Sequence, residues 1–334
     1  GIFEGSATFG STTLSSYGDR DIFIAKLNSS GSWLWTRKAG GTGADASMMV
    51  TLDNEGFVYL GGYYSSTGYF GGITLISAGS SDAFVAKMDA NGNWIWASRA
   101  GGTSSDSVSG ITIDNDNSVY VTGTFNGVAG FGATSLNSSG DYDVFIARLD
   151  SGGTWCNAIK AGGSGADDSS GIGVDATGNV YIAGYFSGTA NFGSTSLTSA
   201  GSIDIFVAKI SPPQYALEIS STPSNALIYK NGISTGFPTP HTFINSSAEL
   251  LGTYSLVLEN YYYDPQTLTG IDTGTTLQFA GFFVGSDQIE WLWASGAGGT
   301  GSDRSYAVAV DGNENSYIAG SFEGTATFGS STLV

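Results

Sequence analysis

The side chains that most often carry catalysis are scarce in this chain. Its 334 residues include one histidine, His241, and one cysteine, Cys156. A Ser-His-Asp triad, a histidine-based zinc site or a histidine general base would have to be built on His241 alone. A pair of carboxylates could hydrolyse a glycoside, but the 29 acidic residues are spread along the chain and no one pair stands out. The sequence therefore predicts a protein that is not an enzyme.

Two sets of aspartates recur at regular positions. One set follows Gly-rich loops (Asp45, Asp106, Asp167 and Asp303), and the other opens an apolar segment (Asp21, Asp82, Asp143 and Asp204). Carboxylates combined with backbone carbonyls can hold Ca²⁺, so the first set is a candidate Ca²⁺ site, and no other cofactor is expected. No copy has EF-hand spacing. The favoured alternative is that these carboxylates accept hydrogen bonds from backbone amides of a neighbouring repeat.

Two further patterns could bind or carry sugars. Asn-x-Ser sequons at Asn28, Asn137 and Asn245 are candidate glycosylation sites. Tryptophans stand at alternate positions, as in Trp33/Trp35 and Trp94/Trp96, and could stack against sugar rings. Because a tryptophan recurs in every copy, packing between strands or blades is the favoured interpretation.

These residues belong to an internal repeat of 61 residues. The segment Asp21 to Leu27 recurs as Asp82 to Met88, Asp143 to Leu149 and Asp204 to Ile210, without insertion or deletion. The fourth copy is interrupted, since Asp167 and its counterpart Asp303 are 136 residues apart. Each repeat contains four candidate strands, with Asp- and Gly-rich hairpin turns between the first two. Four-stranded units at this spacing predict an all-β fold of β-propeller type, with blades starting near residues 1, 62, 123 and 184.

The repeat resembles a known family. The patterns Gly-Gly-Thr-Gly-x-Asp, Ile-x-Val-Asp-x-x-Gly-Asn-Val-Tyr-Ile-Ala-Gly and Asp-x-Phe-Val-Ala-Lys are similar to the SBBP repeat, a bacterial and archaeal β-propeller repeat. The resemblance covers residues 1–211 and 286–334. It implies a propeller and a large secreted or surface-attached protein, often without assigned activity. It carries little information on function.

The interruption has a different character. Residues 212–285 contain Tyr229, the turn at Asn231-Gly232 and the segment Pro223-Ser224-Asn225-Ala226. This resembles the PEGA domain, a small surface β-sandwich, although two of the four residues differ from Pro-Glu-Gly-Ala. The resemblance implies a small inserted β-sandwich domain between two strands of one blade, where an insertion costs little.

Charge restricts the partners. The formal net charge of −18 and the lack of a Lys/Arg cluster argue against nucleic acid and anionic membranes, and no apolar run of about 18 residues spans a membrane. Residues 320–333 repeat residues 1–14, so a terminal strand could pair with another chain. We expect an extracellular or cell-surface structural or adhesive protein that binds itself, other surface proteins or glycans, and assembles into a filament or surface layer. The alternative is a glycan- or peptide-binding propeller module of a larger secreted hydrolase.

Overall fold

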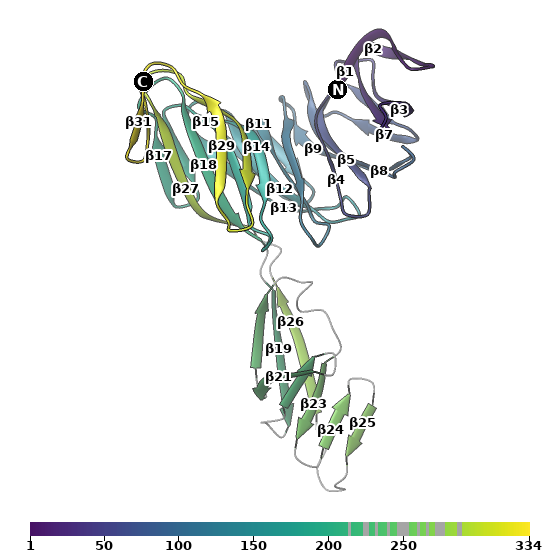
Figure 1. Ribbon diagram of the computed structural model, residues 1–334, viewed down its shortest axis with the longest axis vertical. Coiled ribbons are helices and arrows are strands. Elements are labelled where there is room, and N and C mark those ends of the chain that lie inside the picture. The colour runs from purple at the N-terminus through teal and green to yellow at the C-terminus, as the bar shows by residue number, and fades with distance from the viewer. Residues whose placement is uncertain are drawn as a thin grey trace. The chain divides into compact units, whose positions relative to one another are not determined.

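The computed structural model describes residues 1–212 and 289–334 throughout, and the strands of the segment between them (Figure 1). The chain divides into two compact units: Gly1–Ser211 with Ile289–Val334, and Pro212–Gln288. All regular structure among the described residues is β, as predicted. None of these residues forms a helix of the length and apolarity that a membrane span needs.

The first unit consists of antiparallel sheets that we call blades. Blade 2 has four main strands in the order β4–β5–β8–β9, joined as a meander. Blades 3 and 4 repeat it. The bounds of the main strands are β4 (Ala46–Leu52), β5 (Val58–Tyr64), β8 (Asp82–Met88) and β9 (Trp94–Gly102) in blade 2; β10 (Ser107–Ile113), β11 (Val119–Phe131), β12 (Thr134–Leu149) and β13 (Trp155–Gly163) in blade 3; and β14 (Asp168–Val174), β15 (Val180–Phe186), β18 (Asp204–Ser211) and β27 (Glu290–Gly299) in blade 4.

The outer two blades contain fewer strands within the described residues. Blade 1 has β1 (Ile2–Phe9), β2 (Thr12–Leu27) and β3 (Trp33–Gly41), in that order. Blade 5 has β28 (Arg304–Val310) and β29 (Ser316–Ser321) as a two-stranded sheet. The sheets of blades 2 to 4 begin near residues 46, 107 and 168, so the expected starts near 62, 123 and 184 have the right period and the wrong phase. The period of a repeat does not indicate which strand opens the sheet.

Each blade also carries a hairpin that the sequence reading did not assign. In blade 2 it consists of β6 (Thr67–Phe70) and β7 (Ile73–Ile76), between the second and third main strands. β6 pairs with β3 of the preceding blade, through Gly40 and Gly41. The same pairing joins β11 to β9, β16 to β13 and β30 to β27, so neighbouring blades are linked by backbone hydrogen bonds. The remaining hairpin strands are β16 (Thr189–Phe192), β17 (Thr195–Thr198), β30 (Ala326–Phe328) and β31 (Ser331–Leu333).

Local sequence explains the turns between the first two strands. After β4, the Asp53 Oδ1 atom accepts the amides of Glu55 and Phe57, and Gly56 adopts a φ of 86°. An aspartate that caps its own turn, followed by a residue that tolerates positive φ, is a favoured hairpin connection.

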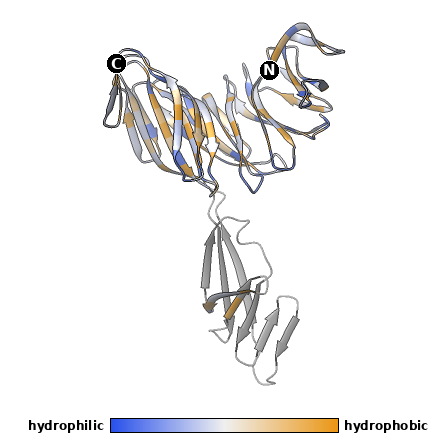
Figure 2. Ribbon diagram, in the orientation of Figure 1, coloured by the Kyte–Doolittle hydropathy of each residue, from blue (hydrophilic) through white to orange (hydrophobic). Residues whose placement is uncertain are grey.

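The core lies along the second and third strands, whose residues are mostly buried in blades 2 to 4, and Figure 2 shows hydrophobic residues along the strands of the blades. All seven residues of β8 are buried, as are all but one of β5. Phe70 on the hairpin packs against Phe84 on the third strand, with tilted rings, and edge-on against Trp94 on the fourth, with ring centroids 4.8 and 5.4 Å apart. The hairpin therefore packs onto its own blade while it pairs with the preceding one.

The second unit is inserted between two strands that pair directly, since Ser211 of β18 faces Glu290 of β27. Its first and last strands also pair, with Tyr215 opposite Gly285. Two sheets are described in it, with orders β22–β19–β26 and β21–β20–β23–β24–β25. Residues 223–226, which carry the resemblance to the PEGA domain, lie outside the described residues. The strands are β19 (Tyr215–Thr222), β20 (Leu227–Lys230), β21 (Ile233–Pro238), β22 (His241–Asn245), β23 (Tyr254–Leu258), β24 (Tyr261–Asp264), β25 (Thr267–Gly270) and β26 (Gln278–Gly285).

Candidate functional site

The four loop aspartates lie buried at the junctions between blades. The Asp45 Oδ2 atom accepts the amide of Gly41 at 2.6 Å, and its Oδ1 atom accepts the amide of Ser65 at 2.9 Å. Gly41 ends β3, which in blade 1 corresponds to the fourth strand of a complete blade, and Ser65 follows the second strand of blade 2, so the carboxylate joins two blades. Asp106, Asp167 and Asp303 make the same two bonds.

These contacts bear on the candidate Ca²⁺ sites. Both carboxylate oxygens of each loop aspartate accept hydrogen bonds from backbone amides, so these carboxylates have a structural role at the blade junctions. Among the residues whose side chains are described, no three His, Cys, Asp or Glu side chains converge as metal ligands would. Ca²⁺ binding at these four aspartates stays a prediction, and it is tested below with a chelator.

The aspartates that open the third strands lie next to the loop aspartates. The Asp21 Oδ2 atom accepts the amide of Tyr17, four residues earlier, at 2.8 Å, and Asp82, Asp143 and Asp204 accept equivalent amides. The Oδ1 atoms of Asp21, Asp143 and Asp204 are buried and accept no hydrogen bond from the described residues. The sequence showed both sets of aspartates but gave no sign that they meet.

A glycine separates the two carboxyl groups in every blade junction. Gly162 has a φ of +147°, and a Cβ atom built on it would lie 2.7 Å from Asp143 Oδ1 and 2.8 Å from Asp167 Oδ2. Gly40, Gly101 and Gly298 occupy the same position in the other junctions. This position therefore admits only glycine, both for its backbone conformation and for the space that the carboxyl groups take.

Burial dominates the electrostatics of these pairs. Burial raises the pKa of Asp106 to about 6 and that of Asp167 to about 6, although the amides that donate to each carboxylate oppose the shift. The partner aspartate, Asp82 or Asp143, raises the pKa further. Asp106 and Asp167 thus take up a proton more readily than exposed aspartates would.

A cation on the fourth strand accompanies the pair in the first three blades. In blade 2 the Arg99 Nη1 atom lies 3.0 Å from Asp82 Oδ2 and donates to the Ile76 carbonyl at 3.2 Å. In blade 3 the Lys160 Nζ atom lies 3.4 Å from Asp143 Oδ2 and donates to the Asn137 carbonyl. Lys38 donates to the corresponding carbonyl of Ser15 in blade 1.

A second set of cations ends the third strands and faces the turn aspartates. The Lys87 Nζ atom lies 3.7 Å from Asp53 Oδ2 and 4.8 Å from the ring centroid of Tyr59. The equivalent Lys209 lies 3.8 Å from Asp175 Oδ2 and 5.0 Å from the Tyr181 ring centroid. These lysines therefore hold the turn between the first two strands against the third strand of the same blade.

The tryptophans pack against the protein. Trp33, Trp94, Trp155 and Trp291 each meet a hairpin phenylalanine edge-on at 5.4 Å. The second tryptophan of a pair reaches the next blade, since Trp35 Nε1 donates to the Ala90 carbonyl at 3.1 Å and Trp96 Nε1 to that of Ser151. These contacts agree with the interpretation that the tryptophans pack between strands and blades, and not with the interpretation that they stack against sugar rings.

The other sequence candidates lie apart from the carboxyl pairs. Asn28 and Asn137 are exposed, but Asn28 Oδ1 accepts the amides of Ser30 and Ser32. The side chains of Asn245 and His241 lie outside the described residues. Cys156 is half-buried and forms no disulfide. Glycosylation at the three asparagines stays a prediction.

Comparison with known proteins agrees with this architecture. Residues 95–131 match the family model described as "Beta-propeller repeat". The match covers one copy of the internal repeat, and the all-β architecture is consistent with a propeller-like repeat fold. The chain is similar to longer proteins: it is 26% identical over 341 residues, and 94% of its length, to "Regulatory protein FlaEY" of Caulobacter vibrioides. It is also 26% identical over 200 residues, half of its length, to "Uncharacterized WD repeat-containing protein L264" of Acanthamoeba polyphaga mimivirus. It spans 33% of the first relative and 14% of the second.

Proposed function

We propose that this chain is a non-enzymatic scaffold of β-propeller repeats that binds other protein chains and assembles with further copies of itself at the cell surface. The observation that carries the proposal is the complementarity of two sheet edges. In blades 2 and 4 the second strand pairs along its whole length with the third. Among the described residues, β29 pairs only with β28, and Ile24–Leu27 of β2 pair only with β3. Each edge presents the backbone groups of one half of such a pairing, which a second copy or a flanking segment of the same protein would complete.

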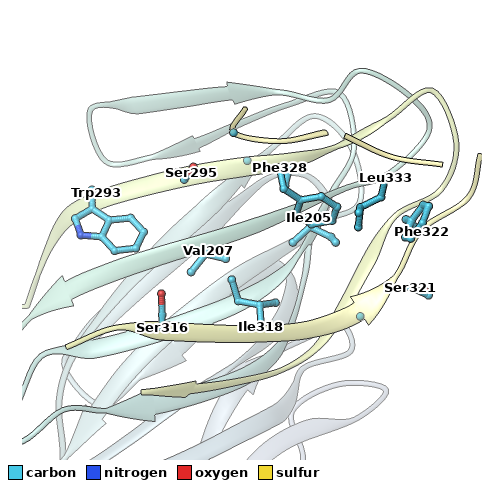
Figure 3. Close-up of a pocket in the computed structure, with 14 residues that line it drawn as sticks. Ile205, Val207, Trp293, Ser295, Ser316, Ile318, Ser321, Phe322, Phe328 and Leu333 are labelled. Carbon is cyan, nitrogen blue, oxygen red and sulfur yellow. The ribbon is translucent and has the colours of Figure 1, made fainter. Parts of the chain in front are cut away.

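The edge of β29 borders an apolar groove of about 500 Å³ (Figure 3). Its floor includes Ile205 and Val207 of β18, and its walls include Ile318 of β29 and Phe328 of the following hairpin. In blade 4 the residues equivalent to Ile318 and Phe328 are Ile182 and Phe192, and they pack with Phe206 of the third strand. The groove therefore has the lining that a third strand covers in a complete blade.

The edge of β2 borders a second groove of about the same size. Ile24 and Leu27 line it together with Met49 and Leu52 of β4. Met49 is 38% exposed and Leu52 is 63% exposed, although β4 is the first strand of blade 2. The equivalent residues of β10 and β14 are covered by the preceding blade, since those strands contact β4, β5, β11 and β12. This groove has the lining that a first and second strand would cover.

Charge complements shape at this joint. Where a blade is complete, a lysine of the third strand lies over a tyrosine of the second and beside the turn aspartate. The two halves of that contact are separate here: Lys26 is on β2, while Tyr317 and Asp311 are together on the other edge, with Tyr317 donating to Asp311 Oδ2 at 3.0 Å. Pairing two copies in the register of blade 4 would bring Tyr317 opposite Lys26.

Pairing of two copies requires that a hairpin of one copy replace a hairpin of the other. Residues 320–333 repeat residues 1–14, so the β30–β31 hairpin of one copy and the hairpin of β1 and β2 of the next compete for one position. Because the two hairpins are nearly identical in sequence, replacing one by the other changes few contacts. Removing residues 320–334 should therefore promote assembly, since it removes the competitor.

Cross-linking tests the register directly. Gly1 and Phe23 exchange two backbone hydrogen bonds, at 3.0 and 3.1 Å. Gly320 would take the place of Gly1, which puts Ala319 opposite Ile24 in the closer, non-hydrogen-bonded type of pair. In a Cys156→Ser background, we expect Ile24→Cys/Ala319→Cys to give disulfide-linked multimers on oxidation. Either single cysteine should give dimers at most.

Imaging completes the test. Negative-stain images of the wild-type chain should show filaments or sheets, and Lys26→Glu should lose them because it places a second acid beside Asp311. Discrete single particles at all concentrations, with no multimers from the double cysteine variant, would refute assembly. Loss of filaments in a chelator would support Ca²⁺ at the loop aspartates. Antibody labelling of intact, unpermeabilised cells tests the surface location, for which the support is the family resemblance.

A further inference from the structure

Blade 4 departs from the other blades at one position on its fourth strand. Lys38, Arg99 and Lys160 occupy this position in blades 1 to 3, and Gly296 occupies it in blade 4. Each register shows the equivalence, since these residues face Phe23, Phe84, Phe145 and Phe206 of the neighbouring third strands. Blade 4 is thus the blade that lacks its own cation next to the carboxyl pair.

The groups that the cations bind are retained in blade 4. In blade 2, Arg99 bridges the Asp82 carboxylate and the Ile76 carbonyl, and in blade 3 Lys160 bridges Asp143 and the carbonyl of Asn137. The corresponding groups of blade 4 are the carboxylate of Asp204 and the carbonyl of Thr198. Asp204 Oδ2 accepts the Ala200 amide at 2.8 Å, and Asp204 Oδ1 is buried and accepts no hydrogen bond from the described residues.

A cavity of about 270 Å³ occupies the place of the missing side chain. Asp204, Thr198 and Gly296 line it, together with Phe186 and Leu197. A Cβ atom built on Gly296 would lie 3.7 Å from Leu197 Cδ1 and 3.8 Å from Phe186 Cε1, which is ordinary contact. Gly296 and Thr198 are exposed, so the cavity opens to solvent, whereas Asp204 at its base is 5% exposed.

The electrostatics of the cavity favour a cation. Asp204 and Asp303 flank Gly298, whose built Cβ would lie 2.6 Å from Asp204 Oδ1 and 2.9 Å from Asp303 Oδ2. Among the described residues no lysine or arginine forms an ion pair with Asp204, and burial raises the pKa of this carboxyl group because the charged form is poorly solvated. A guest that supplies N–H donors and a positive charge would relieve this cost, as Arg99 does in blade 2.

We propose that this cavity binds the cationic head of a lysine or arginine side chain presented by a partner protein. The head donates to Asp204 and to the Thr198 carbonyl, and the methylene stem lies against Leu197 and Phe186. The partner thereby supplies from outside the cation that the other blades supply themselves. Gly296 also lines the groove beside β29, so this site borders one edge of the proposed assembly, but it accepts a side chain rather than a strand, and its occupancy is measured on the single chain.

Binding is tested with short peptides and the whole 334-residue chain. The probe is an uncharged nine-residue peptide with one central lysine, and the matched control carries norleucine at that position. We expect the lysine peptide to shift the amide resonances of Gly296 and Gly298, and the norleucine peptide to leave them in place. Butylammonium tests whether a free amine suffices, and tetramethylammonium, which has no N–H donor, tests for non-specific attraction to the acidic chain.

Two variants make the test specific. Gly296→Lys fills the cavity with the side chain that blades 1 and 3 carry, and should weaken lysine-peptide binding at least roughly tenfold, the scale of one hydrogen bond to a charged group. Lys160→Gly opens the equivalent cavity in blade 3 and should add a second binding site, seen at the amide of Gly162.

Four results would overturn the proposal. The first is the absence of shifts with the lysine peptide. The second is equal binding of the norleucine peptide or tetramethylammonium, and the third is binding that Gly296→Lys leaves unchanged. Binding of butylammonium without binding of the peptide would also overturn it, because the cavity would then accept a small amine and not a side chain of a protein.

Discussion

Replacing Gly162 by alanine should destabilise the junction of blades 3 and 4 much more than a glycine replacement usually does. Gly162 has a φ of +147°, a conformation that alanine rarely adopts. The added methyl group would also lie 2.6 Å from Asp143 Cγ and 2.8 Å from Asp167 Oδ2, so at least one carboxyl group must move. Asp167 would then lose its 2.7 Å bond to the Gly163 amide or its 3.2 Å bond to the Ser187 amide.

The magnitude follows from these two effects. Backbone strain of this kind costs about 1–3 kcal/mol. A lost hydrogen bond to a charged group costs about 1.5–3 kcal/mol. The variant should therefore lose about 2.5–6 kcal/mol of unfolding free energy. Gly188 is the matched control, because it has a φ of +66° and no atom within 4 Å of a built Cβ. Gly188→Ala should cost about 1–2 kcal/mol, from left-handed backbone strain alone.

Urea unfolding at pH 7, monitored by tryptophan fluorescence, measures the loss of unfolding free energy in each of the two alanine variants. Because repeat arrays can unfold in steps, hydrogen exchange of the peptides around residues 158–168 should be measured alongside it. Faster exchange there in Gly162→Ala, with little change in blade 2, would place the effect at the junction. Equal losses for the two alanine variants would refute the account of the carboxyl pair.

Two further predictions concern stability. Because burial raises the pKa of Asp106 and Asp167 to about 6, the folded chain binds more protons than the unfolded chain, so this contribution to stability is present below about pH 4 and is lost as the pH rises through about 6. The thermal midpoint should fall over that range, and less so in Asp106→Asn/Asp167→Asn; an identical fall in the double variant would contradict the assignment. Phe131 is 1% exposed and packs against the rings of Phe145 and Trp155, so Phe131→Ala should cost about 3–5 kcal/mol in urea unfolding. The half-buried equivalent Phe9 is its control, and Phe9→Ala should cost less; equal losses would show that burial is not the cause.

The blades were predictable from the sequence because every turn and strand recurs at one spacing. Asp53 and Gly56 mark a hairpin turn in isolation, and three further copies at equivalent positions leave little doubt of the pattern. The extra hairpin was missed although Phe70-Gly71 recurs at the same spacing as the strands. Its strands are only four residues long, and β6 finds one of its partners in the preceding blade. Short strands that pair across a repeat boundary leave no local pattern.

The carboxyl pairs could not be predicted from a single sequence. Asp21 and Asp45 are 24 residues apart on different segments, and no spacing rule brings them together. They meet because β2 and β3 pair in the register that places Ile22 opposite Ala39. By contrast, the missing cation of blade 4 could have been found by aligning the four copies across the insertion, where Gly296 stands in the column of Lys160. The glycine is visible in the sequence, but its significance depends on the neighbouring carboxylate, which only the structure shows.

The hairpin that pairs with the preceding blade has a consequence for synthesis. The fourth strand of a blade leaves the ribosome before the hairpin that will cover its last two residues, because that hairpin belongs to the next repeat. Each newly made blade therefore waits with an open end until about thirty further residues emerge, and it closes only if the next repeat folds in register. In such an array, the closure of each blade therefore depends on the correct folding of the next repeat. A frameshifted or damaged repeat would expose two blades to proteases: its own blade and the blade before it.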